Sequence, residues 1–581
     1  MFKAKIEEDL KSVIQELNYQ ATDIVLSIPK NFNFGDYTTN IALQLAKQNL
    51  VKDKQNPQVI AKKISQKFWA QNGVKEYLEK VEMVDGFINF FLKDQSLMSN
   101  LHLVCSYSAL VNPEVEGRGG KDRVIVEYTD PNPFKEFHIG HLFSNSIGES
   151  LSRLIESTGA EVKRANYFGD VGMHVAKSVW GMQQKVQSSK FKFKSLEKKS
   201  LVKRVEFLGE AYVLGAKSYD GSEDAKQEIS DINKRIYQKD PSISDLYQKG
   251  REWSLEYFET IYVSLGTKFD YYFPESEVAQ KGQEIVEENL KKGIFEESEG
   301  AVVFPGERFG LHNRVFISSQ GLPTYEAKEL GLAFKKYEQY PYDISVVVTG
   351  NEIKEYFQVL MMALSQIDPD LAKKTTHIPH GMLRMVGGKM SSRKGNVLTY
   401  EWLKGEVSKK IGDLMEDSQL GKDEKQQVID IVSIGAIKFS MLKSSPHMDV
   451  TFDLEKSVSL QGDSGPYLQY SYARAKSVLR SASYNYDLPE IKHQLEPEER
   501  ELLSYIEHFT DVVSESAKSL RPNLVASFLL EFGRTFNLFY QKHPIIKAEE
   551  KSQFRLALTC AVAVVLKQGL YLLGIEVPER M

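Results

Sequence analysis

The stretch from residue 123 to residue 170 constrains the fold most, because two strand-like runs there flank one helix-like run. The first run, RVIVEYTD (123–130), is short and rich in β-branched residues. Residues 141–158 then repeat apolar side chains at helical spacing up to Gly159, and the run EVKRANYFGD follows. A strand, a helix and a strand at this length form a βαβ unit, so we expect a parallel sheet with its ligand at the carboxyl ends of the strands.

The same alternation returns later in the chain and is absent from two other parts. The nearly continuous apolar run YDISVVVTG (342–350) is typical of a strand buried on both faces of a sheet. Residues from 176 to about 265 are polar with helical spacing, and from about 456 onward strand-like runs disappear. We therefore predict a multidomain chain whose α/β part carries a helical insertion and whose last part is all-α.

Composition excludes several classes of protein. With 42% hydrophobic and 26% charged residues, the chain resembles a globular protein rather than a disordered one. No secretory signal is visible, and the apolar run at 557–566 is too short to span a bilayer, so we expect a core helix there and a cytoplasmic protein. Cys105 and Cys560 form neither a disulfide framework nor a zinc motif, and we expect both to be buried small hydrophobes. The net charge of −5 does not exclude RNA binding, which needs only a local basic face.

Two histidines, His138 and His141, flank Gly140 where the first strand gives way to the helix. The start of a helix offers free backbone N–H groups and the positive end of its dipole, which attract phosphate. Two imidazoles would add donors, and a glycine lets a flat base approach the backbone. The pattern predicts a nucleoside triphosphate site; the alternative is a pair of surface histidines beside a helix cap, since four-residue patterns recur by chance.

A second stretch, GGKMSSRKGN (387–396), strengthens this interpretation. It places Lys389, Arg393 and Lys394 in a glycine-flanked loop, and such a set of cations suits a polyphosphate. A basic glycine loop alone is more often a solvated turn. Because this one follows a histidine pair on a βαβ unit, coincidence is a poor explanation.

The two stretches together resemble the hallmark motifs of the class I aminoacyl-tRNA synthetases, HIGH and, far downstream, KMSSR. The passage VEYTDPNPFKEFHIGH is similar to that of the arginyl-tRNA synthetase family in particular. So are FDLEKSVSLQGDSGPYLQYSYARAKSVLR (452–480), GDYTTNIALQLAK (35–47), GFINFFL and the ending LGIEVPERM. The resemblance covers essentially the whole chain in the right order.

The resemblance implies an architecture and a reaction. The expected architecture is an α+β amino-terminal tRNA-binding domain (1–112), an α/β Rossmann-type catalytic domain (113–455, insertion about 176–265) and an all-α anticodon-binding domain (456–581). The expected enzyme activates L-arginine with ATP to arginyl-adenylate and pyrophosphate, then transfers arginine to the 3′ terminal adenosine of arginine tRNA. Mg²⁺ is expected on the pyrophosphate, with no metal ligand assigned to the protein. The enzyme is expected to be a monomer that does not associate with a membrane.

The resemblance also assigns residues to the triphosphate. His138, His141 and Lys389 would stabilise charge on the phosphates, since positioning and electrostatics dominate such a reaction. Most class I enzymes have a lysine where this chain has Ser392, and Lys135 matches the substitute that many arginyl enzymes carry; the alternative is an ordinary solvated loop lysine. The implied ATP-binding residues are His138, Gly140, His141, Gly350, Met382, Lys389, Met390, Ser391 and Arg393.

Recognition of arginine requires carboxylates, because a guanidinium is a planar, permanently charged fork of donors. The chain departs from the family at Glu329, where the family has aspartate, at Glu352, where it has glutamine, and at Glu355, where it has histidine. Acids on a helix more often face solvent, so the alternative for each of these residues is a solvated side chain that binds nothing. The implied arginine-binding residues are Asn132, His138, Glu275, Tyr325, Glu329 and Glu352.

Two further sets of residues suggest contacts with tRNA. The run KFKFKSLEKKSLVKR (190–204) suits phosphates near the acceptor end, although such a run is more often a solvated helix face. Tyr470, Tyr472 and Arg474 are candidates for anticodon reading, with core packing as the alternative. At the level of the whole chain, the rivals are a synthetase-like RNA-binding protein without catalysis and a class I enzyme for another amino acid.

Overall fold

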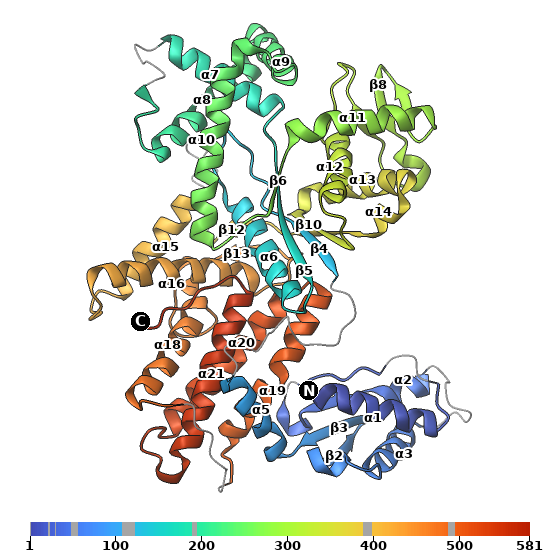
Figure 1. Ribbon diagram of the computed structural model, residues 1–581, viewed down its shortest axis with the longest axis vertical. Helices are drawn as coiled ribbons and strands as arrows, with labels where there is room; N and C mark the ends of the chain where they lie inside the picture. The colour runs from blue at the N-terminus through green and yellow to red at the C-terminus, as the bar shows by residue number, and fades with distance from the viewer. Residues whose placement is uncertain are drawn as a thin grey trace.

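A five-stranded sheet lies at the centre of the protein (Figure 1), in a computed structural model that describes residues 2–20, 24–29, 31–47, 56–106, 122–188, 195–386, 398–485 and 494–581. Its strands, in the order β11-β10-β4-β5-β6, are all parallel. The strands are β4 (Arg123–Glu127), β5 (Glu161–Phe168), β6 (Tyr271–Pro274), β10 (Ile344–Gly350) and β11 (Thr375–His380). The chain builds outward from β4 in one direction and then in the other, so the loops after β4 and β10 diverge and open a crevice there. The expectation of a Rossmann-type parallel sheet is confirmed.

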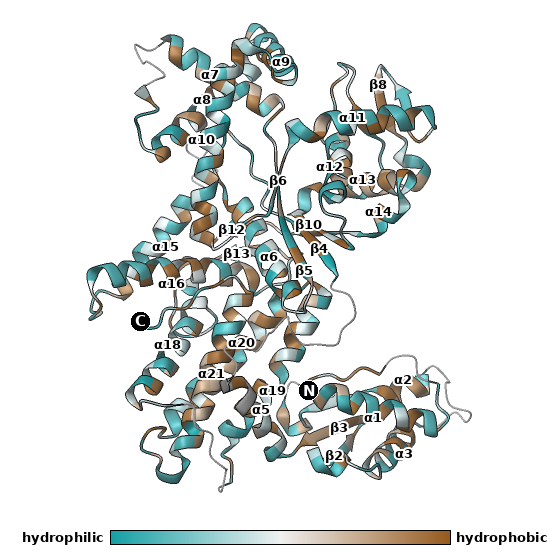
Figure 2. Ribbon diagram, viewed as in Figure 1, coloured by the Kyte–Doolittle hydropathy of each residue, from teal (hydrophilic) through white to brown (hydrophobic). Residues whose placement is uncertain are grey.

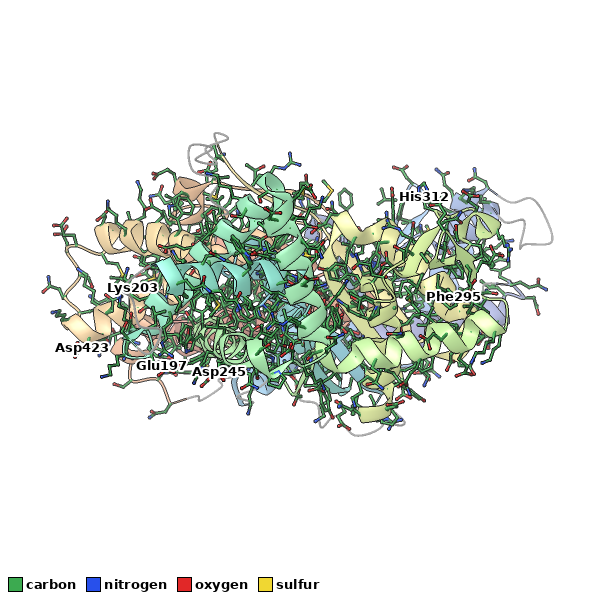
Figure 3. All side chains as sticks on the ribbon, turned by 90° about the horizontal axis from the view of Figure 1, so that it is seen from above. Glu197, Lys203, Asp245, Phe295, His312 and Asp423 are labelled. Atoms are coloured by element: carbon green, nitrogen blue, oxygen red, sulfur yellow. The ribbon has the colours of Figure 1, made fainter. Side chains whose placement is uncertain are left out.

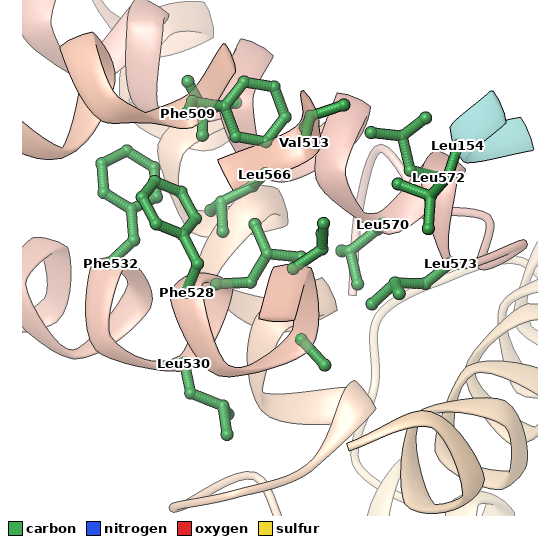
Figure 4. Close-up of a cluster of buried hydrophobic side chains, with 14 of the residues drawn as sticks. Leu154, Phe509, Val513, Phe528, Leu530, Phe532, Leu566, Leu570, Leu572 and Leu573 are labelled. Carbon is green, nitrogen blue, oxygen red and sulfur yellow. The ribbon is translucent and has the colours of Figure 1, made fainter. Parts of the chain in front are cut away.

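Helix α6 (Ile139–Glu156) connects β4 to β5 and covers one face of this sheet. The sequence predicts one apolar face, but the helix is buried on nearly every side, polar residues included. The reason is that the carboxyl-terminal helices cover its outer side, where Leu154 lies beside Leu572 (Figure 4). The buried serines bond to carbonyl oxygens: Ser146 to Leu142, Ser152 to Gly148, and Ser150 to Leu572.

The opposite face of the sheet is covered by a separate group of helices with its own hydrophobic core. A small antiparallel sheet projects between α11 and α12. The elements on this side are α11 (Glu275–Lys291), β7 (Glu296–Ser298), β8 (Ala301–Phe304), η3 (Gly306–Phe309), β9 (Arg314–Ile317), α12 (Tyr325–Gln339), η4 (Asn351–Ile353), α13 (Lys354–Ile367) and α14 (Pro369–Lys373).

The polar segment after β5 forms the expected helical insertion, which packs around a third core. It and the small sheet stand apart when seen from above, with Lys203 and Asp245 labelled on the first and His312 on the second (Figure 3). The insertion helices are α7 (Met173–Ser188), α8 (Leu201–Gly221), α9 (Glu223–Tyr237) and α10 (Pro241–Leu265).

The last part of the chain is helical, as predicted. The strand pair β12 (Leu383–Met385) and β13 (Val450–Phe452) precedes it, and no strand follows β13 in the described residues. Its helices, with those that lead into it, are α15 (Tyr400–Leu414), α16 (Lys422–Leu442), α17 (Leu454–Ser457), α18 (Gly465–Ser481), α19 (Pro497–Ser519), α20 (Asn523–Lys542), η5 (Glu549–Lys551) and α21 (Ser552–Leu572).

Helix α21 is the most apolar of these helices (Figure 2). The segment Glu549–Leu572 passes a length and composition test for a membrane span, the one segment of the described chain to do so. However, 78% of its apolar window is buried inside the protein, as expected for a core helix. Cys560 is buried within it, and the side chain of Cys105 lies outside the described part.

The amino-terminal domain is α+β, as expected. A three-stranded antiparallel sheet, in the order β1-β3-β2, packs against its helices. The elements are α1 (Phe2–Glu16), η1 (Phe32–Phe34), β1 (Tyr37–Thr39), α2 (Ile41–Lys47), α3 (Pro57–Trp69), α4 (Val74–Tyr77), β2 (Leu78–Val84), β3 (Phe87–Leu92) and α5 (Asp94–Ser106).

The amino-terminal domain docks on α19. The buried carboxylate of Asp36 accepts from Arg500 Nη2 at 2.8 Å and from Ser504 Oγ at 2.8 Å. The Tyr37 hydroxyl donates to Asp511 at 2.9 Å. The two parts of the chain furthest apart in sequence are thus bonded directly to each other.

Two cations join the carboxyl ends of α10 and α21, and we call this contact the Arg153–Lys438 joint. Arg153 of α6 donates to the carbonyl oxygens of Gly266 and Tyr571, both at 2.9 Å. Lys438 of α16 donates to those of Leu265 at 2.6 Å and Gly574 at 2.8 Å. Helix carboxyl ends carry unpaired carbonyls, so two such ends meet favourably when hydrogen-bond donors lie between them.

Lys438 tests the joint through stability. Its replacement by methionine leaves two buried carbonyls unpaired, and we expect the free energy of unfolding to fall by about 1–3 kcal/mol. Burial, with Arg153 nearby, lowers the pKa of Lys438 to about 7. Between pH 7 and the ordinary lysine pKa the unfolded chain therefore holds a proton that the native protein lacks, and stability rises with pH in this window.

The measurement is thermal melting of the wild type and Lys438→Met at pH 7 and pH 9. The melting temperature of the wild type should exceed that of the variant, and by more at pH 9. Lys422→Met, at the exposed start of α16, is the matched control and should melt like the wild type. A difference between wild type and Lys438→Met that is equal at both pH values would contradict the titration.

Candidate active site

The loop between β4 and α6 has a strained backbone. Thr129, Asp130 and Phe134 have positive φ angles of 84°, 48° and 68°, which non-glycine residues rarely adopt. Each such residue costs on the order of 1–3 kcal/mol unless its surroundings fix it. Helix α6 does so at Thr129, whose N–H donates to Ser144 Oγ and whose hydroxyl accepts from Asn145, both at 3.0 Å. At Phe134 the fixing bond comes from α10, since its N–H donates to Ser254 Oγ at 2.8 Å.

The histidine pair itself forms the amino-terminal cap of α6. His138 Nδ1 accepts from the N–H groups of Gly140 at 3.1 Å and His141 at 3.4 Å, while His141 Nδ1 accepts from the His138 N–H at 3.3 Å. The two rings stack with centroids 3.5 Å apart. The amides that sequence analysis left free for a phosphate are therefore occupied by the imidazoles, which is a correction to that expectation.

The capping bonds decide what the imidazoles offer to a ligand. A ring that accepts at Nδ1 carries its proton at Nε2 when it is neutral, so both rings present Nε2–H donors. Burial, reinforced by Lys135, lowers the pKa of His138 to about 4, against an opposing effect of Glu352. Burial, then His138 and Lys135, places the pKa of His141 well below its ordinary value. Both rings are neutral donors at neutral pH.

Lys135 lies beside these rings, as its effect on both pKa values shows. Its ammonium group sits 4.6 Å from the ring centroid of Tyr212, which comes from α8 of the insertion. It is thus close enough to the histidines to act on the same anion.

The second motif lies outside the described residues, and with it Lys389, Met390, Ser391, Ser392, Arg393 and Lys394. The chain that follows it is described. Thr399 pairs with His138, and Ile139 N–H donates to Leu398 O at 3.0 Å. The end of this segment therefore lies directly against the histidine cap. Gly350 ends β10 at the crevice, and Met382 is half exposed, with its N–H bonded to Asp449.

Asn132 and Glu275, both assigned to arginine, meet around Gly169. A Cβ at that glycine would lie 2.8 Å from Asn132 Oδ1 and 3.1 Å from Glu275 Oε1, so only glycine permits this approach. Glu275 opens α11 and is buried, and its other oxygen accepts from Lys328 Nζ at 2.7 Å. Glu275 raises the pKa of Lys328 against the effect of burial, whereas burial raises the pKa of Glu275 against the effect of Lys328.

Further carboxyls extend this cluster along α12. Glu127 pairs with Lys336 at 2.6 Å, both buried, and Asp130 accepts only from a backbone N–H, that of Tyr167, among the described contacts. Burial, then Glu127, Asp130 and Glu275, raises the pKa of Glu329 well above its ordinary value, against Lys336. We call Glu127, Asp130, Glu275 and Glu329 the acidic cluster. Lys328 and Lys336 pair with the other two members of this cluster, so within the described residues Asp130 and Glu329 have no lysine partner.

Tyr325 and Glu352 occupy different sides of the crevice. The Tyr325 ring lies 4.9 Å from Lys328 Nζ and 54% of the residue is exposed, so it lines the mouth of the acidic cluster. Glu352 lies in the turn η4 after β10, and its charge acts on His138 and His380. The structure therefore brings Asn132, Glu275, Tyr325 and Glu329 together and leaves Glu352 with the histidines.

Sequence reasoning missed three residues of this site. Lys328 stands within the quoted stretch LPTYEAKELGLA, but its pairing with Glu275 depends on tertiary contact. Tyr167 and Tyr356 are buried beside the acidic cluster, and neither stands in a motif that would mark it in the sequence.

The proposed RNA contacts fare differently. Tyr472 is buried and donates to Glu579, which fits core packing, whereas Arg474 lies between the rings of Tyr470 and Tyr540. Residues 190–194 of the basic run lie outside the described part, and Lys203 and Arg204 form ion pairs on the insertion.

Comparison with known proteins covers all three parts of the chain. Residues 108–454 match the family model described as "tRNA synthetases class I (R), catalytic domain", residues 468–581 the "DALR anticodon binding domain", and residues 2–92 the "Arginyl tRNA synthetase N terminal domain". An arginine–tRNA ligase of Streptococcus pneumoniae serotype 4 is 31% identical, with 100% of both chains covered.

Two solved structures share the fold. The arginyl-tRNA synthetase of Thermus thermophilus superimposes with a TM-score of 0.83 at 24% identity, over 100% of both chains. That of Plasmodium falciparum gives 0.78 at 22% identity, over 100% of this chain and 99% of the other.

Because His138 caps α6, two substitutions of this residue should differ in their effect on stability. His138→Ala removes the acceptor for two amides and should lower the free energy of unfolding by about 1 kcal/mol. His138→Ser restores an acceptor at the same position, since serine is a preferred N-cap residue, and should melt close to the wild type. Equal melting temperatures for the alanine and serine variants would show that the cap contributes nothing.

Proposed function

The chain belongs to the arginyl-tRNA synthetases of class I, and from this premise we propose how its own residues perform the reaction. The enzyme activates arginine with ATP and joins it to tRNA. One observation carries the assignment of roles: a cap of two neutral imidazoles and a buried acidic cluster open on the same crevice of the parallel sheet. The first suits a polyphosphate and the second a guanidinium.

At the triphosphate, the Nε2–H groups of His138 and His141 donate to phosphate oxygens on which charge accumulates as pyrophosphate leaves. Such donors stabilise a transition state most when they are fixed in advance, and the cap fixes both rings. The second motif has Ser392 where most class I enzymes have a lysine, and Lys135 supplies the missing positive charge. By family resemblance, Lys389 and the other residues of that motif bind the same nucleotide, with Gly350 and Met382 at its base and ribose.

Mg²⁺ enters with ATP. No group of three or more possible ligands gathers in the part of the chain that the structure describes. We expect the ion to be held mainly by phosphate oxygens, as Mg²⁺ usually is in such sites. When bound, it neutralises charge on the leaving pyrophosphate.

The guanidinium of arginine enters the acidic cluster between Glu275 and Glu329, with Tyr325 at the mouth. Asn132 then lies toward the α-amino and carboxyl groups, and Glu352 beside His138 faces the end of arginine that reacts. In this orientation the carboxylate of arginine points to the α-phosphate near the histidine cap, which is the geometry that adenylate formation needs.

The remaining parts serve the tRNA. We propose an amino-terminal tRNA-binding domain at 1–112, a catalytic domain at 113–455 and an anticodon-binding domain at 456–581. Arg474 between two tyrosine rings is the best placed anticodon contact, because stacking is how loops of RNA are usually read. The enzyme acts as a monomer in the cytoplasm.

Aminoacylation of a purified arginine tRNA transcript with ATP and a panel of amino acids tests this function. We expect charging with arginine only, and pyrophosphate exchange with arginine in the presence of that tRNA. His138→Ser, which keeps the cap, should lower the exchange rate by about 10²–10³-fold. Charging with another amino acid would reassign the enzyme, and no charging at all would favour an RNA-binding protein without catalysis.

Titration of the acidic cluster predicts a pH dependence for arginine. Burial and neighbouring acids raise the pKa of Glu329, so the empty site favours the protonated carboxyl more than water does, and a cationic guanidinium displaces that proton. Arginine binding then releases this proton, and the KM for arginine should fall as pH rises from 6 to 8, by up to about tenfold per pH unit.

Glu329→Gln should raise the KM for arginine and remove its pH dependence, because the amide cannot titrate. Glu338→Gln, exposed on the same helix, should keep both the KM and the pH dependence of the wild type. A KM for arginine that does not vary over this pH range in the wild type would contradict the prediction.

A further inference from the structure

Two tyrosine hydroxyls in the catalytic domain are buried in the acidic cluster without a bond. Tyr167 is 6% exposed and Tyr356 is 9% exposed, and neither hydroxyl has a hydrogen-bond partner among the residues the structure describes. Burying a hydroxyl without a partner is unfavourable, so nearly all buried polar groups in proteins are paired. Two such groups in one place call for a ligand that pairs with them.

Both tyrosines lie near the acidic cluster but on different elements, and the backbone N–H of Tyr167 donates to Asp130 of that cluster at 3.2 Å. Tyr167 lies at the carboxyl end of β5, two residues before Gly169, around which Asn132 and Glu275 meet. Tyr356 lies in the first turn of α13. After burial, the strongest effects of carboxylates on their raised pKa values come from Glu275 and then Glu329 at Tyr167, and from Glu329 first at Tyr356.

The carboxyls alone are too few for a guanidinium. Its plane carries five N–H donors and no acceptor. One oxygen of Glu275 is already bonded to Lys328, and Glu127 is paired with Lys336. Additional acceptors are therefore needed around the same plane, and they must be neutral, because Asp130 and Glu329 already lack a lysine partner.

A tyrosine hydroxyl meets this need because it accepts and donates at once. It can accept an N–H of the guanidinium at its oxygen and donate its own hydrogen to a carboxylate. We propose that Tyr167 and Tyr356 are specificity-determining residues of the arginine site, each accepting one guanidinium N–H and donating to the acidic cluster. The inference rests on the proposed placement of the guanidinium between Glu275 and Glu329.

The proposal predicts a loss confined to arginine. Replacing either tyrosine by phenylalanine removes one oxygen and keeps the ring and its packing. A hydrogen bond to a charged group is worth enough that the KM for arginine should rise by about 10–100-fold in each variant. The KM for ATP and the KM for tRNA should stay close to those of the wild type, and the melting temperature of the free protein should not fall, because the hydroxyl that is removed has no partner there.

A matched control exists in the same sheet. The Tyr342 hydroxyl is also buried without a partner in the described residues, but Tyr342 precedes β10, at the amino end of the strands and away from the crevice. Tyr342→Phe should leave the KM for arginine unchanged. Glu275→Gln is the positive reference and should raise the KM for arginine much more than that for ATP.

Nω-methylarginine, in which a methyl group replaces one terminal N–H hydrogen, tests the pairing directly as a competitive inhibitor. If a hydroxyl pairs with a terminal N–H, the penalty for methylation should be smaller in the corresponding phenylalanine variant than in the wild type. A tyrosine with a purely structural role would leave the penalty for methylation the same in the variant and in the wild type, so this non-additivity distinguishes the two roles.

The outcomes separate the inference from its premise. If both phenylalanine variants keep the KM for arginine within twofold of the wild type while Glu275→Gln raises it, the hydroxyls are not part of the site. If they raise the KM for ATP equally, the hydroxyls act on the nucleotide or on the fold, and the inference is overturned. If Glu275→Gln also leaves the KM for arginine unchanged, the placement of the guanidinium itself is wrong.

Discussion

The Arg153–Lys438 joint sets the geometry on which the rest of the protein depends. It bonds the carboxyl end of the insertion helix α10 to that of the terminal helix α21. One of its two cations stands on α6, whose opposite end is the histidine cap. Arg153 is itself fixed by Glu149 at 2.7 Å, and Glu149 accepts from Tyr128 at the end of β4. The sheet, the insertion, the carboxyl-terminal helices and the helix that carries the histidine cap therefore share one set of buried polar contacts.

The sequence predicts the parts of this arrangement that rest on local patterns. The βαβ unit around His138 and the helical insertion follow from periodicity, which depends on residues close together in the chain. The acceptor role of the imidazoles does not follow, because it depends on which ring nitrogen faces the first turn of α6. The placement of Glu352 does not follow either, since the turn η4 directs it toward His138. Tyr167 and Tyr356 carry no pattern at all, and only tertiary contact shows that both reach one cluster of acids.

The acidic cluster also shows how function and stability oppose each other. Buried ion pairs such as Glu275–Lys328 and Glu127–Lys336 repay their desolvation only partly, and apolar side chains of the same size would often stabilise a fold more. Unpaired hydroxyls and carboxyls with raised pKa values add to this cost. The strained backbone of Thr129 and Asp130 lies at the same edge of the sheet. These features concentrate at the crevice where we propose that arginine and ATP bind, and the apolar cores on both faces of the sheet offset them.

Docking of the amino-terminal domain has a consequence for biosynthesis. Asp36 bonds to Arg500 across a sequence separation of 464 residues, and the Phe2 N–H bonds to Glu507 across 505 residues. At ordinary translation rates the ribosome needs roughly 20–90 s to make the intervening chain. During that time the nascent amino-terminal domain has to remain folded with its docking carboxylate in water. The contact includes a carboxylate with a guanidinium and hydroxyls beside the ring of Phe32 on Tyr505, so part of the exposed docking surface stays hydrated while its partner helix is still being made.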